Sequence, residues 1–260
     1  MNLQTWLDRI PLPLLYVLTI VLVLLAIGAG IRLGAHMKAR SGEGESIGSV
    51  VGATLGLLAF MLAFTFNMTA NRFDERKQLF LDEINAIGTV YLRAGLLAEP
   101  YTGKVRALLR EYVDIRAQSL TGTTNIRNVI ARSELIHDEL WQAMEALATE
   151  QTPTIVHSLL IQSMNELIDL HGKRVIVGIH YRIPGTIWFG LYAIAVLGMI
   201  MVGYQFGQGR QRQYVAVFML ALAFSSVILL IADLDRAAEG TVRLNLAPLY
   251  ELQQKLRADG

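Results

Sequence analysis

Cysteine is absent from this chain and charged residues are scarce. Without cysteine there can be no disulfide, no thiolate metal site and no cysteine nucleophile. Charged residues make up 17% of the sequence, whereas a typical soluble domain has about a quarter. The net charge is +1, so no basic excess indicates nucleic acid as a partner.

Signals of enzyme chemistry and of β structure are also missing. The sequence has no glycine-rich phosphate loop, no serine-centred elbow and no HExxH metal motif, so catalysis has no visible site. No stretch keeps the alternation of apolar and polar residues that is typical of a strand. We therefore predict an all-α protein that is not an enzyme and that has no cofactor or metal.

Hydrophobic residues make up 53% of the chain and gather in four long apolar runs. Each run has about 20 residues, which is the length that crosses a hydrocarbon core of ~30 Å. The first run is longer than the core of a signal peptide and is followed by basic residues, so we interpret it as a retained span. The predicted spans cover residues 12–33, 47–68, 185–206 and 214–232.

The region between the second and third spans is amphipathic and rich in charge, which predicts a soluble helical bundle. The second span continues into it without a helix breaker as far as Glu99-Pro100. Further helices are expected at 101–120, 126–149 and 153–182, the last starting at Thr152-Pro153. The predicted divisions are 1–70 with the first two spans, 71–183 as the bundle, 184–233 with the last two spans, and 234–260 as a C-terminal tail.

The second span carries a graded face. Gly48 and Gly52 lie four residues apart, which favours close helix packing. At 100° per residue, the next five positions of this face fall within an arc of roughly 80°. Along the helix these side chains change from small to aromatic to amide. This pattern is compatible with a pore lining or with helix packing. We predict pore-lining roles for Gly56, Phe60, Phe64, Asn67 and Asn71.

Ionisable residues are missing from the middle of every predicted span. A proton-coupled transporter or redox pump normally carries one there, so these classes are disfavoured. Glu134 and His137 have the spacing of a di-iron ligand pair, but such a site needs a second copy and further glutamates. We interpret the pair as part of a solvated face, and His171 as a surface or packing residue.

Carboxylates follow the last span at Asp233 and Asp235, next to Arg236. At the C-terminal end of a helix they oppose the macrodipole unless they have a partner. The partner is either a basic residue on the bundle or a bound cation, and we favour the internal ion pair.

Several segments in order along the chain resemble one family of membrane proteins. They are 62–77, 82–94, 165–169, the Ile-Pro pair at 183–184, and the Asp-Leu-Asp-Arg run at 233–236. The chain resembles a bacterial family of integral membrane proteins termed bestrophin-like, which is distantly similar to the bestrophin anion channels.

This resemblance implies a function. Bestrophins are pentameric anion channels with four-span subunits, and apolar side chains of the second span line the neck of the pore. Matching the Arg72-Phe73 pair places Phe60 and Phe64 on neck positions. We expect a homo-oligomeric pore for small ions, with anions the first expectation. The alternative is a non-conducting scaffold or sensor whose bundle binds a partner.

Orientation follows from charge. The short loops carry Arg32, Lys38, Arg40, Arg210 and Arg212, and basic loops stay in the cytoplasm. We therefore expect a multi-pass protein of the bacterial inner membrane, in contact with lipid, with its short loops inside. The bundle and both termini are then outside, although the resemblance to bestrophins implies the opposite orientation.

Overall fold

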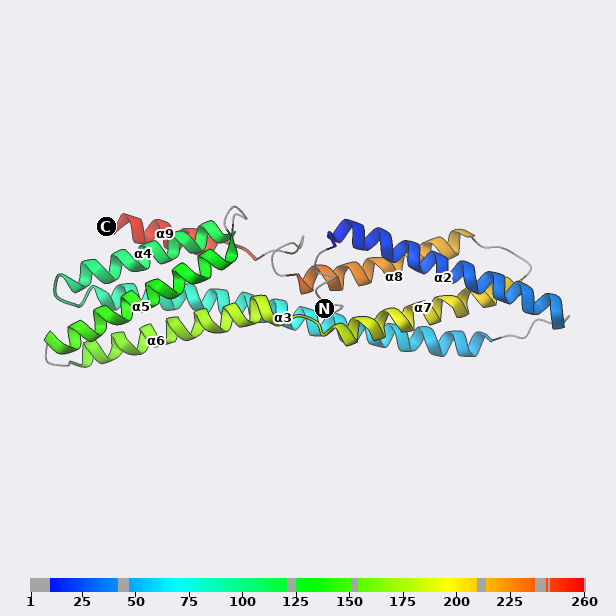
Figure 1. Cartoon of the computed structure of the whole chain (residues 1–260), viewed down its shortest axis with the longest axis horizontal. Helices are drawn as coiled ribbons and strands as arrows, with labels where there is room; N and C mark the ends of the chain where they lie inside the picture. Colours follow the sequence, from blue (N-terminus) through cyan, green and yellow to red (C-terminus); the bar gives the residue numbers. More distant parts are fainter. Residues whose placement is uncertain are drawn as a thin grey trace. The chain divides into compact units, whose positions relative to one another are not determined.

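The computed structural model describes residues 10–41, 47–120, 125–150, 154–209, 214–236, 242 and 244–259. Throughout these ranges the regular structure is helical, so the all-α prediction is confirmed (Figure 1). The chain divides into two compact units. The membrane unit comprises residues 1–73 and 182–243, and the bundle unit comprises 74–181 and 244–260.

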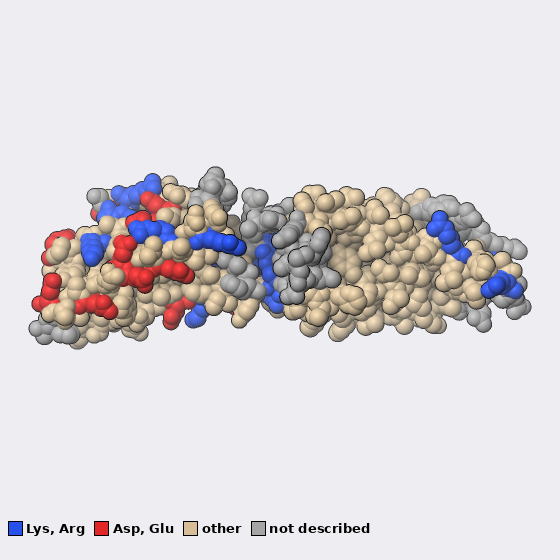
Figure 2. All heavy atoms as spheres, viewed as in Figure 1, with Lys and Arg blue, Asp and Glu red and all other residues tan. Residues whose placement is uncertain are grey.

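In the described part of the chain, four helices are long and apolar enough to cross a membrane, as predicted. Each extends beyond its apolar run, because polar residues at the ends can continue a helix into water. The surface of the membrane unit shown in Figure 2 bears no charged side chain over most of its length. The spans are α2 (Leu12–Ser41), the first part of α3 (Gly48–Ala94), α7 (Gly185–Gln208) and α8 (Tyr214–Asp235).

Glycine contacts hold α2 against α7 inside the membrane unit. Gly30 and Gly34 of α2 face α7, and Gly203 and Gly207 of α7 face α2. A Cβ atom on any of the four would lie closer than 3.0 Å to a backbone atom of the opposite helix. Small residues four apart on both helices allow this backbone approach. Neither pair was among the predicted packing glycines, although each has the same spacing as Gly48 and Gly52.

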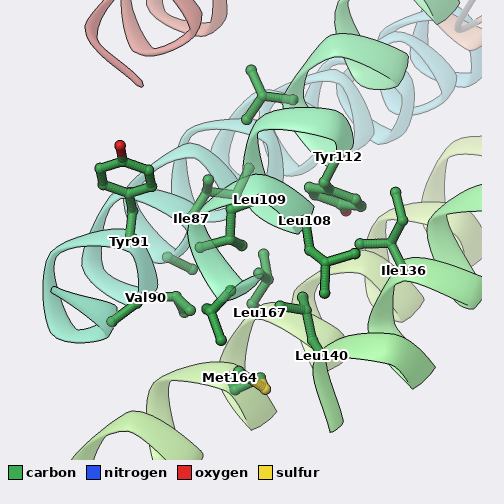
Figure 3. Packing of buried hydrophobic residues seen from close by; sticks show 14 of the residues in the cluster. Ile87, Val90, Tyr91, Leu108, Leu109, Tyr112, Ile136, Leu140, Met164 and Leu167 are labelled. Atoms are coloured by element: carbon green, nitrogen blue, oxygen red, sulfur yellow. The ribbon is translucent and has the colours of Figure 1, made fainter. Parts of the chain in front are cut away.

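The bundle unit has a continuous apolar core (Figure 3). Apolar residues three and four apart on each helix face this core, which is the pattern of an amphipathic helix. Ile87, Leu109, Ile136 and Leu140 are fully buried in it. Besides the second part of α3, its helices are α4 (Tyr101–Leu120), α5 (Ile126–Glu150), α6 (Ile155–Val175), the short π-helix η1 (Ile176–His180) and α9 (Ala247–Ala258).

Two predicted helix ends are wrong. Helix α3 ends at Ala94, before the predicted Glu99-Pro100, because Gly95 opens a turn in which its N–H donates to the carbonyl of Leu92. Helix α6 is capped by Thr154, not by Thr152. The Thr154 hydroxyl accepts from the His157 N–H and the His157 ring accepts from the Thr154 N–H, which satisfies two otherwise unpaired donors.

The C-terminal segment 234–260 was expected to be a tail, but part of it forms α9. Leu249 and Leu256 are buried in the bundle core, and the Arg257 guanidinium lies 2.9 Å from the Asp114 carboxylate. That ion pair is largely exposed, and exposed pairs contribute little. Apolar burial therefore accounts for most of the docking of α9.

The exposure of His137 on α5 differs from the prediction. Glu134 is exposed, as a solvated face requires, but His137 is only 5% exposed. The interpretation is wrong for His137, because position 137 lies on the same side of α5 as the core residues Ile136 and Leu140. Within the described ranges, no three histidine, aspartate or glutamate side chains are placed to hold a metal ion.

The glycine contacts between α2 and α7 predict a selective effect of a single methyl group. Gly203→Ala should destabilise the membrane unit by roughly 1–3 kcal/mol, because the added carbon overlaps the carbonyl of Ile27. Gly28→Ala is the matched control on α2, since a Cβ there meets nothing within 4 Å. Thermal unfolding of both variants in detergent measures the difference. Equal melting temperatures would contradict the proposed close contact.

Candidate functional site

Helix α3 has buried positions in each of the two units. In the membrane unit they recur in steps of three, four or seven residues, which is the period of one helix face. In the membrane unit the hydroxyls of Thr65 and Thr69 bond back to the carbonyls of Met61 and Phe66, so these buried polar groups are satisfied. The buried residues of α3 are Val51, Leu58, Leu62, Thr65 and Thr69 in the membrane unit, and Arg76, Phe80, Glu83, Ile84, Ala86, Ile87, Val90, Tyr91 and Ala94 in the bundle unit.

The graded face predicted from the sequence lies on the opposite side of α3. Gly56, Asn67 and Asn71 are at least partly exposed, Phe60 is 65% exposed and Phe64 is 55% exposed. We call these five residues the α3 ridge. No other part of the described chain buries them, so the ridge faces lipid, water or another molecule.

The amides at the end of the ridge are bonded to each other. Asn71 Nδ2 donates to Asn67 Oδ1 over 2.8 Å, one helical turn apart. This bond uses the carbonyl oxygen of Asn67 and leaves its NH₂ group as a donor. A donor that has no charge can bind a partly dehydrated anion or a water molecule.

The predicted packing glycine Gly52 meets no partner helix among the described residues. A Cβ on Gly52 or Gly56 would meet nothing within 4 Å, in contrast to the four glycines between α2 and α7. Helix packing through Gly48 and Gly52 therefore stays a prediction, and it requires a helix from outside the chain.

The carboxylate of Asp235 connects three segments of the membrane unit. Its Oδ1 accepts from the Ile183 N–H over 3.0 Å and lies 3.9 Å from the Arg72 guanidinium. The Asp235 carbonyl accepts from Arg182 over 2.8 Å. Asp235 is therefore in contact with the end of the α3 span and with the entry to α7, and it is itself buried.

The neighbouring Asp233 and Arg236 are buried as well. Asp233 Oδ2 accepts from the Val242 N–H over 3.1 Å, which holds residue 242 beside the end of α8. An ion pair was predicted for the acidic residues, but Arg72 and Arg182 were not predicted as their partners. The available signal was that both arginines flank a predicted span on the same side as Asp235.

Comparison with known proteins identifies the family. The sequence matches the bestrophin-like domain over residues 15–249. The chain belongs to the bestrophin-like family. Among curated proteins, no sequence matches it.

Solved structures of bacterial bestrophin homologues share the fold. A point mutant of the Klebsiella pneumoniae homologue superposes with a TM-score of 0.69 at 14% identity, over 95% of this chain and 99% of that one. The same homologue solved by Zn-SAD phasing gives 0.66 at 14% identity, over 94% and 96%. A further structure, described only as a membrane protein with a proline-to-alanine mutation, gives 0.69 at 15% identity, over 95% and 97%.

The bonds of Asp235 predict graded effects of substitution. Asp235→Ala should destabilise the protein by about 3–5 kcal/mol, because it leaves buried donors without an acceptor. Asp235→Asn should cost less, since its amide oxygen can still accept from the Ile183 N–H. Glu75→Gln, at an exposed position on α3, serves as the control and should change little. Chemical denaturation in detergent gives the order, and a neutral Asp235→Ala would contradict it.

Proposed function

We propose that the protein is a homo-oligomeric membrane pore for small ions, with α3 from each subunit around the axis. One observation carries the proposal: α3 is the span least covered by its own chain. In an apolar window of 18 residues, 22% of the α3 window is buried, against 33% of the window in each of the other three spans. Its uncovered side is the α3 ridge, whose small, aromatic and amide residues differ from a uniform lipid-facing surface.

The geometry of the ridge fits a constriction. In a ring of subunits, Phe60 and Phe64 form two successive rings of apolar side chains, and such rings can gate by excluding water. Gly52 and Gly56 have room for a neighbouring helix. Bestrophins have five subunits, and the mass of the complex in native nanodiscs would count the subunits here.

Two observations bear on whether the permeant ion is an anion or a cation. Resemblance to bestrophins favours anions. The same arc of α3 continues past Asn71 with Glu75, Gln78 and Asp82, with Gln78 donating to Asp82 over 2.9 Å. Rings of acidic side chains favour cations. The reversal potential under a potassium chloride gradient distinguishes the two.

A non-conducting scaffold or sensor is the second candidate. The surface of the bundle unit carries interspersed acidic and basic side chains (Figure 2), which suits contact with a polar partner. An intact oligomer without conductance would favour this candidate. Membership of the bestrophin-like family gives no support to an enzyme.

We assign Asp233, Asp235 and Arg236 a structural role in this pore. The assignment is supported by the backbone donors bonded to both carboxylates and by Arg72 beside Asp235. These contacts favour an internal ion pair over a cation site.

Planar-bilayer recording of the purified protein tests the pore. The double variant Phe60→Ala, Phe64→Ala should raise the single-channel conductance, because the constriction loses two aromatic rings per subunit. Phe189→Ala with Phe218→Ala is the matched control. Phe189 on α7 is 66% exposed and Phe218 on α8 is 46% exposed, so the control removes similarly exposed rings from other spans.

The control variant should conduct like the parent protein. If both double variants change conductance equally, α3 has no special place in the pore. If no form conducts although the oligomer is intact, the pore proposal is wrong and the scaffold takes its place.

For orientation, we propose that the short loops lie in the cytoplasm of a bacterial cell. Arg32, Lys38 and Arg40 lie at this end of α2, and Lys38 donates to the Gln208 carbonyl at the end of α7. Arg210 and Arg212 fall outside the described residues. Alkaline phosphatase fused after residue 260 should be active, and green fluorescent protein should be dark there. The reverse pattern would place the bundle unit in the cytoplasm.

A further inference from the structure

A cluster of charged side chains is buried in the bundle unit, among the helices whose apolar residues appear in Figure 3. At its centre is Glu83 of α3, whose side chain is 3% exposed. Glu83 Oε2 lies 2.9 Å from Arg174 Nε of α6 and 3.4 Å from Arg116 Nη2 of α4. The three residues carry two positive charges and one negative charge. The carboxylate therefore joins α3 to two other helices.

Tyr112 and His171 extend the cluster, and their bonds fix the position of a proton. The Tyr112 hydroxyl donates to Glu83 Oε1 over 2.6 Å, because a carboxylate can only accept. The same hydroxyl oxygen lies 3.0 Å from His171 Nδ1. Since its hydrogen is already donated, the phenol oxygen accepts from Nδ1–H. The neutral ring of His171 then has a bare Nε2, which is buried without a hydrogen-bond partner among the described residues.

His137 of α5 completes the cluster. Its ring meets the His171 ring edge-on at 4.8 Å between centroids and lies 5.0 Å from the Tyr112 ring. Its Nε2 is also buried without a partner in the described chain, as is the hydroxyl of Ser133 one turn earlier. An added proton at either imidazole Nε2 therefore finds no hydrogen-bond acceptor in the packed bundle.

Electrostatics make both histidines resist protonation in the packed state. Burial lowers the pKa of His137 to about 4, although Glu83 and Asp138 attract a proton and Arg174 repels one. Burial, with Arg174, His137 and Arg116, lowers the pKa of His171 to about 3 against the attraction of Glu83.

The other titratable groups of the cluster keep their charge states as the pH falls toward 5. Burial alone would raise the pKa of Glu83, but Arg174 and Arg116 bring it to about 2, so it stays ionised. Burial raises the pKa of Tyr112 well above its ordinary value, so it stays neutral. The histidines are therefore the groups whose charge can change.

We propose that the Glu83 cluster is an acid-released latch, in which proton uptake by His137 and His171 frees α3 from α4, α5 and α6. The sign follows from linkage. In a loosened bundle both imidazoles are hydrated and titrate near a pKa of about 6.5. Below that pH the loosened state binds more protons than the packed state, so the packed state loses stability as the pH falls. The latch itself does not depend on conduction; its effect on a pore rests on the function proposed above.

Hydrogen exchange of the full-length protein in nanodiscs tests the latch. Protection of residues 80–94 of α3, corrected for the intrinsic pH dependence of exchange, should fall about tenfold or more between pH 7 and pH 5, since each unit of pKa difference is worth a factor of ten. In the variant His137→Phe, His171→Asn it should stay within about threefold, because neither residue titrates while the Asn amide can still donate to Tyr112.

His36→Asn removes an exposed histidine at the end of α2 and should behave like the parent protein. If the double variant does not fold, the single variant His137→Phe replaces it, since the Nε2 of His137 has no hydrogen-bond partner to lose among the described residues. Between pH 7 and pH 5, protection of α3 should fall less in this variant than in the parent protein. Protection of the parent that persists at pH 5, or equal losses in parent and variant, would overturn the latch. An absence of conductance would leave this exchange result unchanged and would count only against the pore.

Discussion

Helix α3 passes from the membrane into water, and it packs against other helices of its own chain in both environments. It runs for 47 residues without a break, and in the part inside the hydrocarbon every backbone donor and acceptor has to be bonded within the helix. Leu62 and Thr65 of α3 are buried in the membrane unit, and Phe80 and Glu83 are buried in the bundle unit. Which positions of α3 are buried and which are exposed determines the packing surfaces of the other helices and the exposure of the α3 ridge.

The helical framework was predictable because its signals are local. A run of about 20 apolar residues has few alternatives to a membrane span, and the three- and four-residue periodicity of the bundle helices identifies their buried sides. Helix ends were less predictable where two signals compete. Pro100 and Pro153 both stop or start helices in principle, but Gly95 and Thr154 provide caps nearer to the helix that forms.

Contacts between distant segments could not be predicted. The sequence shows that Asp235 needs a partner, but it does not say that Arg72, Arg182 and the Ile183 N–H converge on it. The buried histidines are a second case. His137 sits at a core position of α5, yet a histidine there gives no apolar signal, so its burial depends on Tyr112 and His171 from other helices. The exposure of the α3 ridge was compatible with the sequence, but its function depends on neighbours outside the chain.

The glycine contacts between α2 and α7 have a mechanical consequence. Two helices that meet through side chains can slide by exchanging rotamers, whereas Gly30, Gly34, Gly203 and Gly207 bring one backbone directly against the other. Such a joint has no soft layer between its parts, and it resists both shear and separation. Helices α2 and α7 therefore behave as one rigid element within the membrane unit. We therefore expect the unit to adjust to bilayer thickness or lateral pressure mainly at α3, whose span is the least buried of the four.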